Sequence, residues 1–144
     1  MERQRVESKI LLMLKYIKRL QGFESVTEEN YVNDFDLQLI SERLIQLLVE
    51  AATDINSYLL VELHQVTPST YFDSFILAGQ NGIISQGLAA TLSKSAGMRN
   101  RLVHQYDEIN QRIVFSAIFR ALEQYPIFIN QVNNYLDSLE VDNG

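Results

Sequence analysis

The feature that most constrains this fold is a three- and four-residue spacing of apolar side chains along almost the whole chain. Such a period is that of an amphipathic α-helix, and no alternating strand pattern of useful length interrupts it. The spacing predicts a first helix over residues 2–21, stopped at Gly22, and a second over residues 34–63. Along the second helix the apolar face comprises Leu37, Ile40, Leu44, Leu47, Leu48, Ala51, Ile55, Leu59 and Leu63. The chain is therefore expected to be all-α.

Capping and breaking residues divide the rest of the chain into further helices. Ser69 is predicted to cap a short helix, and Ser85 to cap a fourth that continues into residues 99–106, with Gly97 as its weak point. The last long helix is expected over residues 109–136, kinked or split at Pro126. Together these elements predict an up-and-down bundle of four or five helices.

Composition indicates a globular protein. The 144 residues are 47% hydrophobic and 21% charged, which suits one helical domain over residues 1–139 followed by a frayed tail over 140–144. With no cysteine, disulfide and thiol chemistry are excluded. No apolar run approaches the roughly 18 residues that span a bilayer, and the N-terminal pattern is not that of a signal peptide. A cytoplasmic location, with no membrane partner, is therefore expected.

The segment Arg99–Tyr106 carries the residue types that can act on a phosphodiester. Arginine is a permanent planar cation suited to phosphate oxygens, and His104, one of two histidines, can transfer a proton near neutral pH. Asn100 can bind a phosphate or orient the histidine, and Tyr106 adds a hydroxyl and a stacking face. Arg101 is a candidate for substrate contact, although a plain surface charge also explains it. As a structural alternative, the histidine caps a helix and the tyrosine is half-buried packing.

The charge distribution favours phosphate binding near this segment. The chain has a net charge of −6, yet residues 91–120 contain five basic and two acidic residues. The remainder contains seven basic and sixteen acidic residues. A local concentration of positive charge fits phosphate contacts but not broad binding to long nucleic acid. Ordinary solvated helix charges explain the same distribution equally well.

In RNA, the 2′-hydroxyl is an internal nucleophile beside each phosphate, so cleavage needs an acid or base and a cation. His104 and Arg99 supply these groups without a metal or other cofactor. A straight helix places these two about 140° apart, but Arg99 and Tyr106 only about 20° apart. Long side chains, a bend near Gly97 or a second subunit must therefore bring Arg99 and His104 together. A twofold dimer with two motifs across one cleft is the simplest arrangement, and the length of the second helix suits it.

This pattern closely resembles the signature of the HepT-like toxins, small helical ribonucleases of the HEPN superfamily. The resemblance extends over roughly residues 40–136. It rests on Glu42-Arg43-Leu44-Ile45-Gln46, Glu50-Ala51, Asp54-Ile55, Thr67-Pro68-Ser69, Phe75, Gly82-Ile83-Ile84, Ala96-Gly97-Met98-Arg99-Asn100 and Val103-His104-Gln105-Tyr106-Asp107. It implies the toxin of a prokaryotic type II/VII-like toxin–antitoxin pair, a homodimer or higher even oligomer with a composite site. It also implies that a minimal nucleotidyltransferase (MNT) antitoxin adds AMP to Tyr106.

Other features are weaker. His64 is interpreted as a loop residue, and Asp34 and Asp36 as cap or first-turn residues, not metal ligands. Glu50 and Asp54 either orient a site residue or pair with exposed cations, and the second interpretation is favoured. No phosphate-binding loop, hydrolase elbow or zinc motif is present. The alternative function is a non-catalytic helical module that binds a nucleotidyltransferase partner or a nucleotide.

Overall fold

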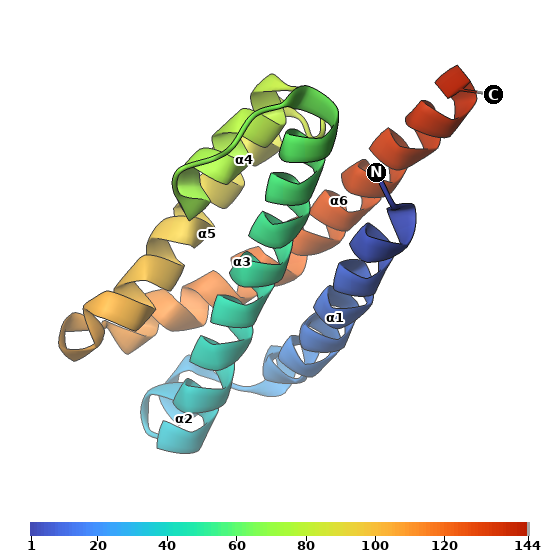
Figure 1. Ribbon diagram of the computed structural model, residues 1–144. Coiled ribbons are helices and arrows are strands. Elements are labelled where there is room, and N and C mark those ends of the chain that lie inside the picture. The colour runs from blue at the N-terminus through green and yellow to red at the C-terminus, as the bar shows by residue number, and fades with distance from the viewer. Residues whose placement is uncertain (144) are drawn as a thin grey trace.

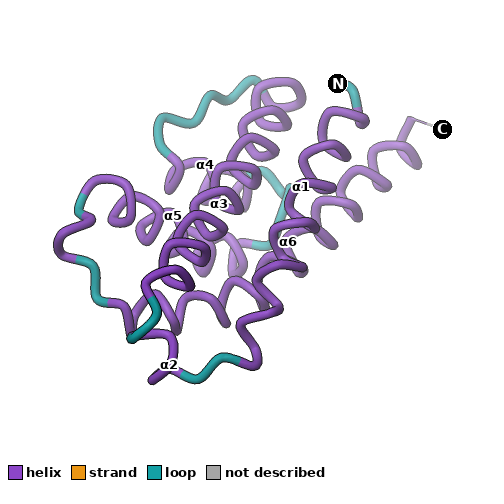
Figure 2. The backbone as a smooth tube through the Cα atoms, turned by 90° about the horizontal axis from the view of Figure 1, so that it is seen from below, coloured by secondary structure: helices purple, strands orange, loops and turns teal. Residues whose placement is uncertain are grey.

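The computed structural model describes the backbone of residues 1–143 and the side chains through Val141. Within residues 1–143 there are six α-helices and two 3₁₀ turns. The tube in Figure 2 shows helix and loop but no strand in this part of the chain. The bounds of the helices and turns are α1 Arg3–Gln21, η1 Gly22–Ser25, α2 Glu28–Val32, α3 Phe35–His64, α4 Tyr71–Gln80, α5 Gln86–His104, η2 Tyr106–Glu108 and α6 Gln111–Asn143. All but α2 have ten or more residues, so the predicted all-α bundle is confirmed.

Polar side chains cap the N-termini of four helices. The side chains of Thr27, Asp34, Thr70 and Ser85 each accept a hydrogen bond from a backbone N–H in the first turn of the following helix. The cap predicted at Ser69 is therefore wrong by one residue. The Ser69 hydroxyl instead donates to Asp73 at 3.1 Å. Asp34 is a cap, as the sequence predicts.

Helix α3 is the central element of the bundle. It contacts α1, α4, α5 and α6, and Figure 1 shows it between α1 on one side and α4 and α5 on the other. Its length and composition would suffice to cross a membrane, but 56% of its most apolar window is buried inside the bundle. The predicted apolar face is confirmed in part: Leu48, Ala51, Ile55 and Leu59 are buried, whereas Ile40 is 38% exposed. The buried side of α3 also includes Ile45, Val49, Ala52 and Leu60, which the prediction left out. His64 is the last residue of α3, not a loop residue, and its Nε2 lies 2.7 Å from the Tyr135 hydroxyl.

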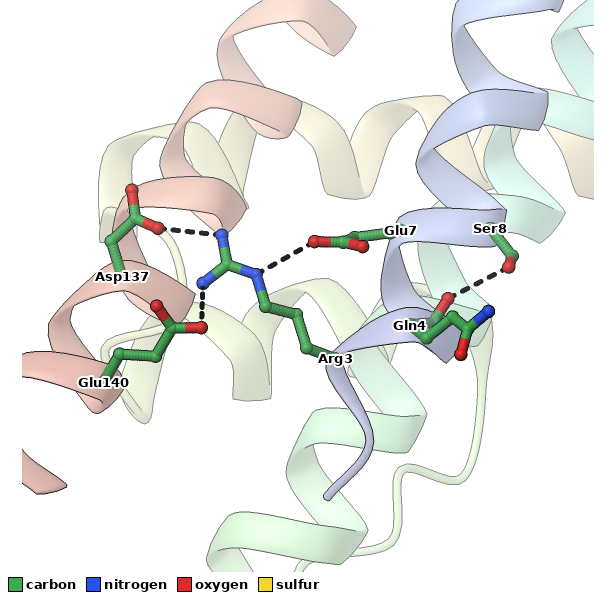
Figure 3. A network of polar contacts seen from close by, with 6 residues as sticks. All are labelled: Arg3, Gln4, Glu7, Ser8, Asp137 and Glu140. Atoms are coloured by element: carbon green, nitrogen blue, oxygen red, sulfur yellow. Dashed lines mark hydrogen bonds and ion pairs between the residues drawn. The ribbon is translucent and has the colours of Figure 1, made fainter.

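The chain ends lie close together because α1 and α6 pack side by side (Figure 1). The Arg3 guanidinium forms ion pairs with Glu7 on α1 and with Asp137 and Glu140 on α6 (Figure 3). These carboxylates raise the pKa of Arg3, with Asp137 the strongest contributor. Helix α6 begins at Gln111, contains Pro126 without being split, and is helical to Asn143. Fraying of residues 140–144 stays a prediction, and Gly144 lies outside the described residues.

Candidate functional site

The predicted motif is divided between a helix and the turn that follows it. Helix α5 is continuous through Gly97 and ends at His104, and at Gln105 the backbone leaves helical geometry with φ −129° and ψ 39°. Tyr106 then begins the 3₁₀ turn η2. The expectation that Tyr106 shares a helical face with Arg99 is therefore wrong, because no helix connects the two. Arg99 and His104 do belong to one helix and keep their separation of about 140°.

Arg99 is held by side chains of α3 and α4. Its Nη2 donates to Glu50 Oε1 at 3.0 Å, and its guanidinium carbon lies 4.4 Å from the centre of the Tyr71 ring. The Arg99 side chain is only 14% exposed, and its buried Nε has no hydrogen-bond partner. A carboxylate and an aromatic face together fix a guanidinium in position and orientation. Arg99 is therefore a preorganised cation.

For Glu50, the structure corrects the interpretation favoured from the sequence, which was pairing with an exposed cation. Glu50 belongs to the motif's surroundings, because it pairs with Arg99 and also accepts a hydrogen bond from Gln46 at 3.1 Å. Asp54, one turn later, pairs with Lys9 at 2.9 Å on the surface, as favoured. Two carboxylates four residues apart thus have different roles. The sequence could not separate them because the arginine partner lies 49 positions away.

The surroundings of Arg99 include an open hollow of about 370 Å³. Its lining consists of Ser57, Pro68, Ser69, Thr70, Tyr71, Arg99 and Asn100. The Asn100 side chain is exposed, and its Oδ1 lies 3.4 Å from Arg99 Nη1. A guanidinium has five N–H donors, so the pair with Glu50 leaves donors for a second anion. The hollow thus offers cationic, hydroxyl and amide groups to a phosphate.

His104 is exposed at the end of α5. Among the described residues, neither a hydrogen bond nor an ion pair holds its ring. The structure therefore does not bring His104 and Arg99 together within one chain. An imidazole in this position is accessible to a substrate or to a second subunit.

Tyr106 faces a buried carboxyl group that the sequence did not single out. Its hydroxyl interacts with Glu42 of α3, whose side chain also accepts a hydrogen bond from Gln111 at 3.2 Å. Glu42 is only 6% exposed, and its buried Oε2 has no hydrogen-bond partner. Burial raises the pKa of Glu42, and burial together with the Glu42 charge raises the pKa of Tyr106. The Tyr106 side chain remains 44% exposed, so it is also open to solvent.

Tyr31 also belongs to this polar cluster. Its hydroxyl lies 2.7 Å from Ser41 Oγ and donates to Gln111 Oε1 at 3.3 Å. Burial raises the pKa of Tyr31 to about 12. No local sequence signal identifies Glu42, because the apolar face predicted for this helix lies on its opposite side, and the burial of the carboxyl group appears only in the structure. Within the part of the chain that the structure describes, no group of three or more His, Asp or Glu side chains can hold a metal ion.

Comparison with known proteins identifies the family of this chain. The sequence profile of the family described as Ribonuclease HepT-like matches residues 13–132. The chain is 42% identical to a tRNA nuclease HepT from Aphanizomenon flos-aquae, over 96% of this chain and 94% of that protein. It is 33% identical to an mRNA nuclease HepT from Shewanella oneidensis, over 87% of this chain and 93% of that one.

Solved structures show the same fold. A tri-AMPylated HEPN toxin of Shewanella oneidensis, in complex with an MNT antitoxin, superposes with a TM-score of 0.82 and 32% identity. The match covers 90% of this chain and 96% of that toxin. A toxin–antitoxin crystal structure with AMP-PNP gives a TM-score of 0.82 and 31% identity, over 90% and 97% of the two chains. Because of the profile match, the similarity to these relatives and the shared all-α fold, the chain belongs to the HepT-like ribonuclease family of the HEPN superfamily.

Proposed function

We propose that this protein is the toxin of a toxin–antitoxin pair and cleaves RNA without a metal ion, using Arg99 and His104. The observation that carries the proposal is that one helix holds both a fixed cation and an accessible imidazole. Arg99 is held by Glu50 and Tyr71, and His104 is exposed five residues later. The relatives named as tRNA and mRNA nucleases support RNA as the substrate class.

In the proposed reaction, the 2′-hydroxyl oxygen attacks the adjacent phosphorus and forms a cyclic phosphate. The bond from phosphorus to the 5′-oxygen breaks, and that oxygen leaves as a hydroxyl. His104 transfers a proton at one of the two oxygens, and the Arg99 guanidinium stabilises the charge that develops on the phosphoryl oxygens. Asn100 and Arg101 contact the substrate or orient it.

The separation of the two residues supports a site shared between two copies of the chain. Side chains about 140° apart on one helix diverge, whereas a twofold axis places each Arg99 opposite the partner subunit's His104. We therefore propose a homodimer or a higher even oligomer. The cytoplasmic location expected from the sequence stays a prediction.

The proposed regulation is addition of AMP to Tyr106 by a cognate MNT-type antitoxin. The solvent exposure of Tyr106 supports it, as does the AMPylated toxin among the structural relatives. The tyrosine oxygen would attack the α-phosphorus of ATP, the tyrosine proton would pass to a base, and pyrophosphate would leave. The added phosphate places negative charge two residues from His104, where it repels an RNA backbone.

The decisive experiment incubates purified protein with RNA beside the His104→Ala variant, in the presence and absence of EDTA. We expect the parent to cleave RNA equally with and without the chelator, leaving 2′,3′-cyclic phosphate ends, and the variant to be inactive. Cleavage by folded His104→Ala protein would refute the proposed role of this histidine. Binding of RNA or of nucleotide without cleavage by the parent would instead support the non-catalytic module.

A further inference from the structure

A second hollow lies on the side of α5 away from Arg99. It is a groove of about 450 Å³ between α5 and α6, reached also by Phe72 from α4. Lys94 and Arg101 of α5 and Arg120 of α6 are among its lining residues. We call it the α5–α6 groove. It is larger than the hollow beside Arg99 and contains neither of the two residues proposed for catalysis.

The charge of the groove is not balanced by neighbouring acidic groups. Lys94, Arg101 and Arg120 are all exposed, and no carboxylate lines the groove. Among the described residues, the ion pairs use Arg3, Lys9, Arg99 and Arg112, and none uses these three cations. Arg120 donates only to the Ser116 hydroxyl, at 2.9 Å. Arg101 also borders a smaller hollow with Glu108, without an ion pair between them.

Three exposed cations that line one groove, in a protein of net charge −6, form a local site for an anionic ligand. Phe72, 51% exposed at the edge of the groove, adds an aromatic face. Proteins bind single-stranded nucleic acid through two kinds of contact. Basic side chains contact the phosphates of its backbone, and aromatic rings stack on its bases.

The groove also leads to the proposed catalytic histidine. At 100° per residue, Lys94 and Arg101 are about 20° apart on α5, and His104 is about 80° from Lys94 at the edge of the same face. Arg99 is about 140° from Lys94, on the opposite side. A strand that occupies the groove therefore passes His104 of the same chain, and the phosphate that it presents must meet Arg99 of the partner subunit.

From these observations we propose that the α5–α6 groove binds the backbone of single-stranded RNA next to the cleaved bond, with Lys94, Arg101 and Arg120 on its phosphates. This proposal rests on the proposed ribonuclease function and states where on the protein surface the RNA substrate lies. Phe72 stacks a base at the edge of the groove.

Gly97 permits a steric test that does not alter charge. It lines the groove, and a β-carbon at this position would have no atom of another element or side chain within 4 Å. Leucine is a better helix former than glycine, so Gly97→Leu should preserve α5 while its side chain fills the groove. A second variant replaces Lys94, Arg101 and Arg120 together by alanine. Its matched control replaces Lys15, Lys18 and Arg43, three exposed basic residues of α1 and α3 outside the groove, and so has the same net charge.

Binding of a fluorescent single-stranded RNA oligonucleotide is measured as a function of salt, with His104→Ala in every protein so that the probe stays intact. We expect the groove triple variant to bind at least about tenfold more weakly and its salt slope to fall by about 2, since each phosphate contact contributes about 0.7. Gly97→Leu should also weaken binding, with an unchanged circular dichroism spectrum. The control triple variant should bind as the parent does.

Equal binding by the groove and control triple variants would overturn the inference, as would normal binding by Gly97→Leu. A change in oligomeric state of Gly97→Leu, with normal RNA affinity, would assign the groove to contact between copies instead. Cleavage of RNA by proteins with an intact His104 is measured separately. If the groove variants cleave RNA as fast as the parent, this inference is refuted and the proposed function stands. If RNA binding depends on the groove but the parent does not cleave RNA, the proposed function is refuted and this inference stands.

Discussion

Arg99 on α5 and Glu50 on α3 form an ion pair of 3.0 Å in which both side chains are largely shielded from solvent, at 14% and 29% exposure. The pair joins the motif helix to the central helix of the bundle. It holds the guanidinium against Tyr71, at the margin of an open hollow. Glu50 thus acts on the proposed reaction through Arg99.

Glu50→Gln tests this positioning role. The amide keeps the shape of the side chain but removes the charge that orients Arg99, so we expect the rate constant for RNA cleavage to fall about tenfold. Asp54→Asn on the same helix is the matched control, since Asp54 pairs with Lys9 on the surface. In an Arg99→Lys background, Glu50→Gln should have a much smaller effect on cleavage, because the two residues act as one unit. Additive losses in that double variant would contradict the positioning role.

Arg99→Ala should also reduce stability, although the sequence alone allows Arg99 to be a surface charge. Removal of the guanidinium leaves Glu50 without its ion-pair partner and Tyr71 without its stacking contact. We expect a loss of about 1–2 kcal/mol in the free energy of unfolding. Thermal denaturation should show His104→Ala melting like the parent, because the imidazole is exposed. Equal melting temperatures for Arg99→Ala and His104→Ala would show that the ion pair contributes no stability.

Mixing two inactive variants tests the shared site. If each site combines Arg99 of one subunit with His104 of the other, a heterodimer of Arg99→Ala and His104→Ala has one intact site and one doubly altered site. A refolded equimolar mixture should therefore recover about a quarter of the parental activity, and light scattering should give a dimer or a multiple of it. A mixture that stays inactive, or a monomer that cleaves RNA, would refute the composite arrangement.

Tyr106→Phe should keep the fold, since Tyr106 is 44% exposed, its ring remains and only one hydroxyl is lost. It should block AMP transfer by the antitoxin and leave cleavage active or partly weakened. Mass spectrometry after incubation with the antitoxin and ATP should find the added mass on the Tyr106 peptide of the parent. Tyr16→Phe is a control for general tyrosine labelling. An adduct at another residue would refute the proposed regulation but not the nuclease function.

Glu42→Gln should make stability less dependent on pH. Because burial raises the pKa of Glu42, the folded protein holds this proton more tightly than the unfolded chain does. Parental stability should therefore decline as pH rises from about 4.3, the ordinary glutamate value, through the raised folded pKa. The amide mimics the protonated acid, so the variant should melt about 3 °C higher than the parent at pH 7. At pH 4 the two proteins should have the same melting temperature. The same shift at both pH values would contradict this explanation.

The sequence was sufficient for the helices and for the identity of the motif. The three- and four-residue apolar spacing predicted α1 and α3 within one residue at each end, because helix formation depends on neighbours one turn away. Short-range signals also identified the caps at Asp34 and Ser85. Arg99, Asn100, His104 and Tyr106 are close in sequence, so their chemistry could be recognised without a structure.

The tertiary structure alone decided which side chains surround that motif. Glu50, Tyr71 and Glu42 belong to other helices, and a hydrogen bond across the bundle leaves no local periodicity in the sequence. The end of α5 at His104 likewise depends on how the chain turns into α6, and it moved Tyr106 away from the helical face predicted for it. Sequence thus determined most of the long helices and the candidate residues of the motif, because both are local properties. Packing determined their partners, because contacts between helices depend on distance in space, not along the chain.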